Sequence, residues 1–119
     1  MKYIILVSTI LISLNLSSQV LINEYSASNM TGITDAFNDN EDWVELFNPS
    51  GASVDLTDWY LSDRSGNILK WQFPSASLNA NDHLLLFCSS RDVVQGGEIH
   101  TSFKLSQTEG DWVILSNNF

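Results

Sequence analysis

The feature that most constrains this chain is a regular succession of short apolar runs and turn residues, seen most clearly in residues 43–74, WVELFNPSGASVDLTDWYLSDRSGNILKWQFP. Apolar runs bounded by Asn, Asp, Ser, Gly and Pro at intervals of roughly 8 to 12 residues are typical of the strands of a β-sandwich or barrel. No segment has a sustained helical period of apolar residues. The 119 residues, 44% of them hydrophobic, suffice for one domain with a compact core. The sequence therefore predicts a single all-β domain.

The N-terminal segment predicts a signal peptide rather than a part of that domain. A short basic start is followed by a long apolar run and then by small residues near Ser17. This order is typical of secretion, and an apolar region of about 12 residues is too short to span a membrane. The alternative, an N-terminal core strand, is disfavoured because the run does not alternate. We therefore expect residues 1–19 to be a signal peptide, cleaved between Ser17 and Val20, and residues 20–119 to form the domain.

Charge and cysteine usage limit the possible partners and the location. Without the signal peptide, four basic residues face fourteen acidic ones, a net charge of −10. Such a surface repels phosphate, so nucleic-acid binding is not expected. No cysteine comes directly after the apolar run, where attachment of a lipid would require one. We expect the mature chain to have no transmembrane span and to be secreted, periplasmic or at the cell surface, free or covalently linked to a neighbouring domain.

The predicted strands enclose one long polar loop. Residues 20–26 and 42–48 are the first two strands, and residues 27–40 between them form a loop that is unusually long for a compact domain. Loops of this length are generally functional or mobile. Later strands are expected in residues 54–61 (two short pieces), 68–73, 84–88, 100–105 and 111–115.

The alternation of side chains predicts a core between two layers. Its expected members are Val44, Leu46, Leu56, Trp59, Leu61 and Phe73. The run at 84–88 does not alternate, which is typical of a central strand covered on both faces. Cys88 is the single cysteine, so no intrachain disulfide can form, and we expect it to be a buried small hydrophobe.

Five segments carry a family resemblance when they are taken together. They are VLINEYSASN (20–29), DWVELFNPS (42–50), VDLTDWYLSD (54–63), KWQFP (70–74) and HTSFKLS (100–106). With these segments the mature chain resembles the lamin tail domain, an immunoglobulin-like antiparallel β-sandwich of nuclear lamins and of secreted bacterial proteins. The signal peptide makes the chain more similar to the secreted bacterial type.

The C-terminus departs from that family. Members run on past the strand that matches residues 111–115 into a closing strand, whereas this chain stops at Phe119. We therefore expect a domain truncated at its C-terminus. If this is the natural end, an open sheet edge would invite pairing with another chain.

The strongest candidate for a metal site is an acidic cluster in the long loop. Its carboxylates belong to Asp35, Asp39, Glu41 and Asp42. Hard cations such as calcium take several oxygen ligands from a flexible loop. The spacing is not that of an EF-hand. Solvated loop carboxylates are the alternative to a calcium site, and no other cofactor is expected.

Aromatic residues offer a second candidate, a carbohydrate-binding surface. The tryptophans are Trp43, Trp59, Trp71 and Trp112. Trp43 alternates with Val44, so one of the two must face away from the core, and an exposed indole could stack on a sugar ring. The alternative is core packing, which the resemblance implies for Trp59. A sugar site is favoured if an exposed tryptophan and the loop at 27–40 share one concave surface.

Catalytic signals are weak. His83 and His100 lie in different segments, and a structural hydrogen bond is the expected role of His100. No Gly-x-Ser-x-Gly motif occurs. A glycosidase would need Glu24 and Glu45 in a cleft, which a small sandwich rarely has. We therefore expect no enzymatic activity.

The resemblance implies a non-catalytic extracellular module for protein interaction or structural scaffolding, accessory to a larger secreted or surface protein. A calcium- or carbohydrate-binding module is the alternative, and a small hydrolase is a third, less favoured hypothesis.

Overall fold

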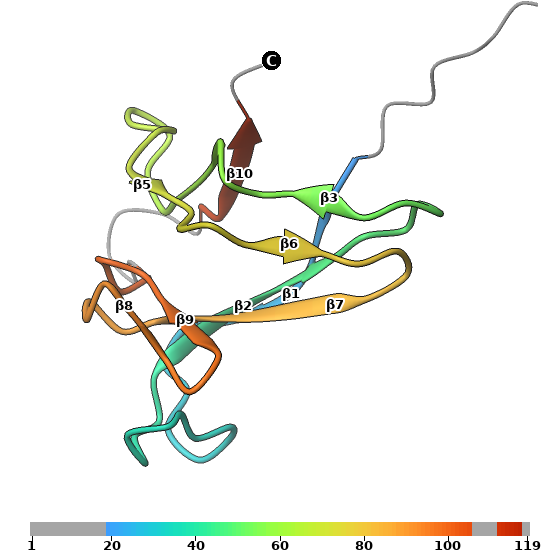
Figure 1. Cartoon of the computed structure of the whole chain (residues 1–119). Coiled ribbons are helices and arrows are strands. Elements are labelled where there is room, and N and C mark those ends of the chain that lie inside the picture. Colours follow the sequence, from blue (N-terminus) through green and yellow to red (C-terminus); the bar gives the residue numbers. More distant parts are fainter. Residues whose placement is uncertain (1–18, 106–111, 118–119) are drawn as a thin grey trace, which may run out of the picture.

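The computed structural model describes residues 19–105 and 112–117, and in these ranges all regular secondary structure is strand. Figure 1 shows two layers, a long sheet below and shorter strands above it. The predicted all-β, immunoglobulin-like sandwich is confirmed. Within the described ranges no helix is long and apolar enough to cross a membrane. The predicted signal peptide and the predicted C-terminal truncation concern residues outside these ranges and stay predictions.

The larger sheet has five strands. Their order is β1 (Leu21–Ser26), β2 (Asp42–Phe47), β7 (His83–Cys88), β9 (Glu98–His100) and β8 (Val93–Gln95). All neighbours are antiparallel except β7 and β9, which are parallel. The chain leaves β7, forms β8 at the edge, and returns through a tight turn to place β9 between them. The prediction of a purely antiparallel sandwich therefore missed the parallel pair of β7 and β9. The order of strands along the chain does not show which strand lies between β7 and β8.

The second layer consists of two small sheets. One has the order β10 (Ile114–Asn117), β4 (Trp59–Ser62) and β5 (Trp71–Gln72), and the other pairs β3 (Val54–Asp55) with β6 (Ser77–Leu78). Figure 1 shows β3 and β6 above the larger sheet. These strands are short because turn residues interrupt the chain every few positions, as expected from the sequence.

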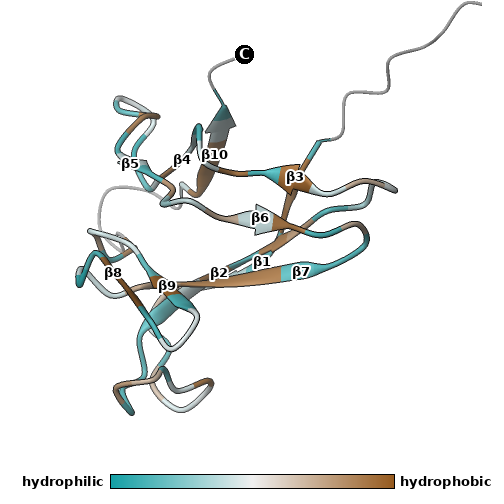
Figure 2. Ribbon diagram, viewed as in Figure 1, coloured by the Kyte–Doolittle hydropathy of each residue, from teal (hydrophilic) through white to brown (hydrophobic). Residues whose placement is uncertain are grey.

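The hydrophobic core lies between the layers. It contains all six residues expected from the alternation, each at most 5% exposed: Val44, Leu46, Leu56, Trp59, Leu61 and Phe73. On β7, Leu86 and Cys88 face the same cluster, whereas Phe87 is buried outside it. The end of this strand is therefore covered on both faces, as the lack of alternation predicts. In Figure 2 the apolar stretches of β2 and β7 run through the middle of the fold.

The strand boundaries near the end of the domain differ from the prediction. Residues 93–95, which lie between the strands predicted at 84–88 and 100–105, form β8, and the predicted strand at 100–105 is irregular after His100. Gly96 and Gly97 connect β8 to β9 with φ angles of 59° and 83°. Two consecutive positive φ angles are the requirement of a two-residue type I′ hairpin turn. Two glycines at this point were the signal for a hairpin that the sequence reading missed.

A buried asparagine joins the two layers at the far end of β2. Asn48 is fully buried, and its Nδ2 donates to the carbonyl oxygens of Ala52, Leu78 and Asn79 at 2.8, 3.0 and 3.1 Å. Its Oδ1 accepts from the N–H of Ser50 at 3.0 Å. One side chain thus bonds to backbone groups of the turn after β2 and of the end of β6. It adds a second donor to carbonyl oxygens that also accept from Oγ of Ser50, Oγ of Ser53 and the N–H of Asp82.

Cys88 gives a prediction on reactivity and pH. It is fully buried, and burial raises the pKa of its thiol from 9.0 to about 12. Between these two values the unfolded chain loses a proton that the folded chain keeps. The resulting stability is complete below pH 9.0 and is lost as the pH rises towards 12. We expect the folded protein to resist iodoacetamide at about pH 8 and the denatured protein to react fully, as measured by mass spectrometry. Full labelling of the folded protein would contradict this.

Candidate functional site

A second buried cluster lies on the face of the larger sheet that points away from the core. Trp43, Phe87 and His100 are neighbours across β2, β7 and β9 in register, and each is at most 9% exposed. The rings of Phe87 and His100 stack with centroids 5.4 Å apart. Phe37 meets His100 edge-on, also at 5.4 Å. Residues 27–41, called the acidic loop below, therefore reach this face of the sheet.

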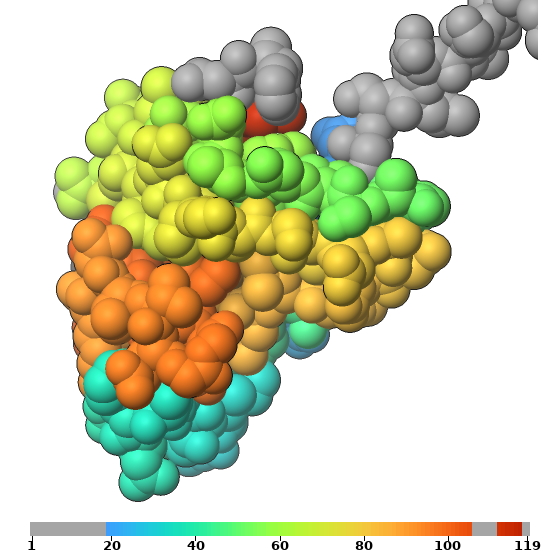
Figure 3. Space-filling model, in the orientation of Figure 1, coloured from blue at the N-terminus to red at the C-terminus, as the bar shows by residue number. Residues whose placement is uncertain are grey.

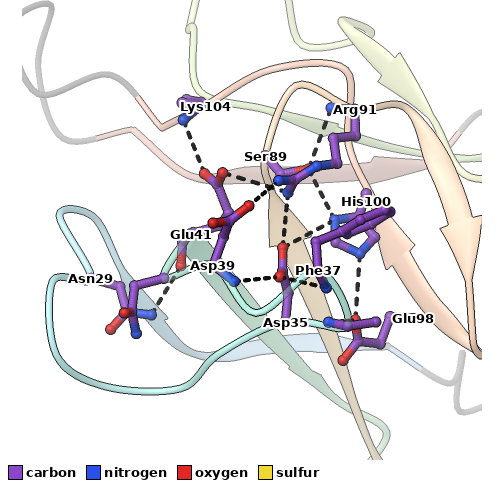
Figure 4. Close-up of polar contacts among 12 residues, drawn as sticks. Asn29, Asp35, Phe37, Asp39, Glu41, Ser89, Arg91, Glu98, His100 and Lys104 are labelled. Carbon is purple, nitrogen blue, oxygen red and sulfur yellow. Dashed lines mark hydrogen bonds and ion pairs between the residues drawn. The ribbon is translucent and has the colours of Figure 1, made fainter.

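Arg91 holds the acidic loop to the sheet (Figure 4). Its Nη1 lies 2.9 Å from Oδ2 of Asp35 and 3.5 Å from Oε1 of Glu41, and its Nη2 pairs with Asp39. The guanidinium also lies over the Phe37 ring, 4.3 Å from the centroid. Three carboxylates that the sequence singled out as metal ligands thus surround one guanidinium. Lys104 adds a second cation, 3.0 Å from Oε2 of Glu41.

Asp35 is the centre of this arrangement because its side chain is completely buried. While Oδ2 faces Arg91, Oδ1 accepts the N–H groups of Phe37 and Asp39, both at 2.9 Å. Asn38 between them has a φ of 65°, a left-handed conformation that asparagine tolerates. The carboxylate therefore shapes the turn and binds the arginine at once.

Asn29 shapes the other half of the loop. Its Nδ2 donates to the carbonyl oxygens of Ile33 and Glu41 at 2.7 and 3.1 Å, and its Oδ1 accepts from the N–H of Gly32 at 2.9 Å. A Cβ atom on Gly32 would lie 2.5 Å from Oδ1 of Asn29, so this close approach requires a glycine. The loop is thus ordered by its own side chains.

Asp42, the fourth predicted metal ligand, has different partners. Its Oδ1 accepts the N–H of Ser28 at 2.8 Å, and its Oδ2 accepts the N–H of Leu105 at 3.2 Å. It therefore ties the start of the acidic loop to the segment after β9. The structure brings the other three carboxylates together and gives this one a separate role.

The position of Arg91 affects the calcium prediction because its charge occupies the place where a cation would balance the loop carboxylates. The positive charge that would hold Asp35, Asp39 and Glu41 together is present as Arg91. Among residues 19–105 and 112–117, no group of three or more His, Cys, Asp or Glu side chains is arranged to hold a metal ion. Calcium binding stays a prediction, and a calcium titration followed by thermal unfolding tests it.

His100 has the structural hydrogen bond expected from the sequence. Its Nδ1 lies 2.9 Å from Oγ of Ser89, and both residues are buried. Its Nε2 has no hydrogen-bond partner among the described residues and lies 3.5 Å from Oε2 of Glu98. Although serine, histidine and glutamate are the residue types of a nucleophilic relay, Ser89 is only 5% exposed, so its hydroxyl is closed to a substrate. His83 stacks on Phe47 at the opposite end of β7, so the two histidines do not meet.

The tryptophans are distributed differently from the carbohydrate-binding hypothesis. Trp43 and Trp71 are 9% and 6% exposed, whereas Trp112 is 52% exposed. Trp112 lines a depression of about 360 Å³ with the turn at 64–67. The depression beside the acidic loop is a different one, lined by Ser28, Asn29, Met30, Asn40, Glu41, Asp42, Lys104 and Leu105. An exposed tryptophan and the loop thus do not share these surfaces. Glycan binding stays a prediction, with Trp112 as its better candidate.

The acidic loop also exposes large apolar side chains. Met30, Ile33 and Phe37 are 81%, 44% and 43% exposed. Sequence reasoning singled out the loop for its carboxylates and missed these residues, as it missed the role of Arg91. The available signal was three apolar residues in an otherwise polar segment.

The fold defines an immunoglobulin-like β-sandwich module. The family model described as Lamin Tail Domain matches residues 15–118. The chain therefore belongs to the lamin tail domain family, a family of non-enzymatic modules, and the resemblance drawn from the five segments is confirmed. No curated protein and no solved structure matches the chain.

Proposed function

We propose that this chain is a non-catalytic protein-interaction module of the extracellular space, accessory to a larger secreted or surface protein, and that the acidic loop is its contact surface. The observation that carries the proposal is that this loop is held in one conformation while it exposes Met30, Ile33 and Phe37. A preformed loop loses little conformational entropy on binding. Exposed apolar side chains among charged ones are typical of protein-binding sites.

The charges indicate which partner surface would fit. The chain has a net charge of −9, and Asp39, one of the loop carboxylates, is 54% exposed at its side chain even in its ion pair. Complementary charge increases the rate of association and selects between partners. The fitting partner is therefore a protein with apolar pockets and a basic rim.

We propose a module without catalytic activity because the hydroxyl of Ser89 is buried. The one serine–histidine pair described above is enclosed by the sheet and by the acidic loop. An acyl-transfer site needs its nucleophile and oxyanion donors open to the same substrate. The arrangement instead supports a structural role for the pair.

A substitution at Met30 tests the contact surface. Because its side chain is 81% exposed, Met30→Ser removes an apolar contact and leaves stability within about 0.5 kcal/mol. We expect at least a tenfold, or about 1.4 kcal/mol, loss of affinity for a partner identified by cross-linking in the native extracellular fraction. Isothermal titration calorimetry measures the change.

The matched control is Trp112→Ser, which removes another exposed apolar side chain outside the loop. It should leave the affinity unchanged. The opposite pattern, with Trp112→Ser abolishing binding and Met30→Ser leaving it intact, would contradict the proposal and favour the depression beside Trp112.

A further inference from the structure

Within residues 19–105 and 112–117, strand β8 is an edge strand of the larger sheet, on a different element from the acidic loop. It ends the strand order, and all three of its residues are exposed, with Val93 and Val94 at 36% and 53%. In an antiparallel edge strand, alternate residues direct their N–H and C=O groups away from the neighbouring strand. Natural proteins often protect such edges with lysine or proline. β8 has neither.

This edge is held in a defined conformation. The turn at Gly96 and Gly97 fixes its C-terminal end, and three register pairs join it to β9. At its N-terminal end, Oδ1 of Asp92 accepts from the indole Nε1 of Trp71 at 2.9 Å, and the N–H of Asp92 donates to the carbonyl of Thr101 at 3.1 Å. β8 is thus prepared for pairing without further ordering.

A depression lies between β8 and β5, the edge strand of the second layer. It measures about 140 Å³, and its lining includes Trp71 on the side of β5 and Asp92, Val93 and Val94 on the side of β8. Figure 3 shows the surface where the segments of β5 and β8 meet. An apolar cavity of about 150 Å³ accommodates a benzene molecule. This depression therefore has room for one apolar side chain next to the open backbone groups.

We propose that β8 binds an extended peptide as an added strand, with one apolar side chain of that peptide in the depression between β8 and β5. Pairing with an edge strand supplies backbone hydrogen bonds, and a neighbouring pocket selects a side chain. A small molecule would leave the backbone groups of β8 without strand partners. The bound partner is a peptide strand rather than the sheet of a folded protein, because an edge of three residues is too short for stable pairing between two whole sheets.

Charge selects the kind of peptide. Asp92 adjoins the depression, and the whole chain has a net charge of −9. A second copy of the chain would bring the same negative charge to this edge. The complementary occupant is a segment that alternates apolar and basic residues.

The probe for this site is the capped peptide Lys-Val-Lys-Phe-Lys-Val-Lys, titrated into the full chain and followed by amide NMR shifts. We expect saturable shifts at residues 93–95 and at the Trp71 indole. The same peptide methylated at alternate backbone nitrogens keeps its charges and side chains but loses backbone donors. It should bind at least tenfold more weakly. Equal binding of both peptides, or shifts that leave β8 unaffected, would overturn the proposal.

Protein variants separate strand addition from attraction between charges. Val94→Asp adds a negative charge, which strengthens purely electrostatic binding of a lysine peptide but weakens insertion of an apolar side chain. We expect at least fivefold weaker binding. Leu21→Asp makes the same change of charge at the opposite edge strand, β1, where Leu21 is 44% exposed, and should not weaken binding. Tighter binding by Val94→Asp would overturn the proposal.

Discussion

Replacement of Asn48 by alanine is expected to destabilise the protein by about 3 to 4 kcal/mol. The change removes the donor for three carbonyl groups and the acceptor for the Ser50 N–H, at a position with no exposure to solvent. One intramolecular hydrogen bond contributes about 0.5 to 1.5 kcal/mol of net stability, and four buried or half-buried ones are lost here at once. Chemical denaturation, with the slope of the transition held constant between the two proteins, measures the loss.

The control for this experiment is Asn23→Ala. Asn23 is exposed and donates one side-chain hydrogen bond, to Oε1 of Glu45 at 2.7 Å, so we expect a loss below about 1 kcal/mol. A second variant, Asn48→Asp, keeps an oxygen at the Oδ1 position but places a carboxylate against the carbonyls. It should not restore stability. Equal, small effects of Asn48→Ala and Asn23→Ala would show that the layers are not joined through this side chain.

The second large effect is expected for Arg91→Met. Removal of the guanidinium leaves the fully buried carboxylate of Asp35 without its cation. Loss of one partner of a buried ion pair costs about 3 to 5 kcal/mol, and because the Arg91 side chain is 28% exposed we expect about 2 to 3 kcal/mol. The acidic loop should loosen before the rest of the fold. Hydrogen exchange should therefore accelerate at the amides of Phe37 and Asp39, which donate to Asp35.

Lys104→Met is the matched control, since it also removes one cation next to Glu41. Lys104 is 59% exposed at its side chain, and an exposed ion pair is worth about 0 to 1 kcal/mol. In Lys104→Met, hydrogen exchange at the amides of the acidic loop should be as fast as in the unaltered protein. Unchanged stability and unchanged exchange in Arg91→Met would mean that the loop holds its shape through the Asn29 and Asp35 hydrogen bonds alone.

Arg91→Met also separates the two proposed surfaces. A loosened acidic loop should bind its protein partner more weakly, because Met30 and Phe37 would no longer be preorganised. The edge strand β8 keeps its turn and its pairs with β9. Binding of the lysine-containing peptide to β8 should therefore remain.

Local patterns were sufficient to predict much of the fold. Val44 and Leu46 alternate with Trp43 and Glu45 on one strand, and the period of two assigns them to a single face without any knowledge of distant residues. By contrast, β8 was missed because its three exposed residues lie within a polar, glycine-containing stretch, where the pattern favours a loop.

The candidate site was predictable only in part. Its acidic residues stood out because they are close in the sequence. Arg91 did not, because it is separated from Asp35 by 56 positions and local spacing says nothing about such a contact. The exposure of Trp112 and the burial of Trp43 were equally undetermined, since an alternating strand shows which side chains share a face but not what covers that face.

The amino-acid sequence by itself determined that this protein is a β-sandwich of the lamin tail domain family, with the core residues it predicted. These properties follow from short-range alternation and turn chemistry, which act within a few residues. Only the tertiary structure decided that β9 enters between β7 and β8, that Arg91 gathers the loop carboxylates, and that β8 is left at an edge. The physical reason is that strand order and ion-pair partners depend on how distant segments pack, and many packings satisfy the same local pattern.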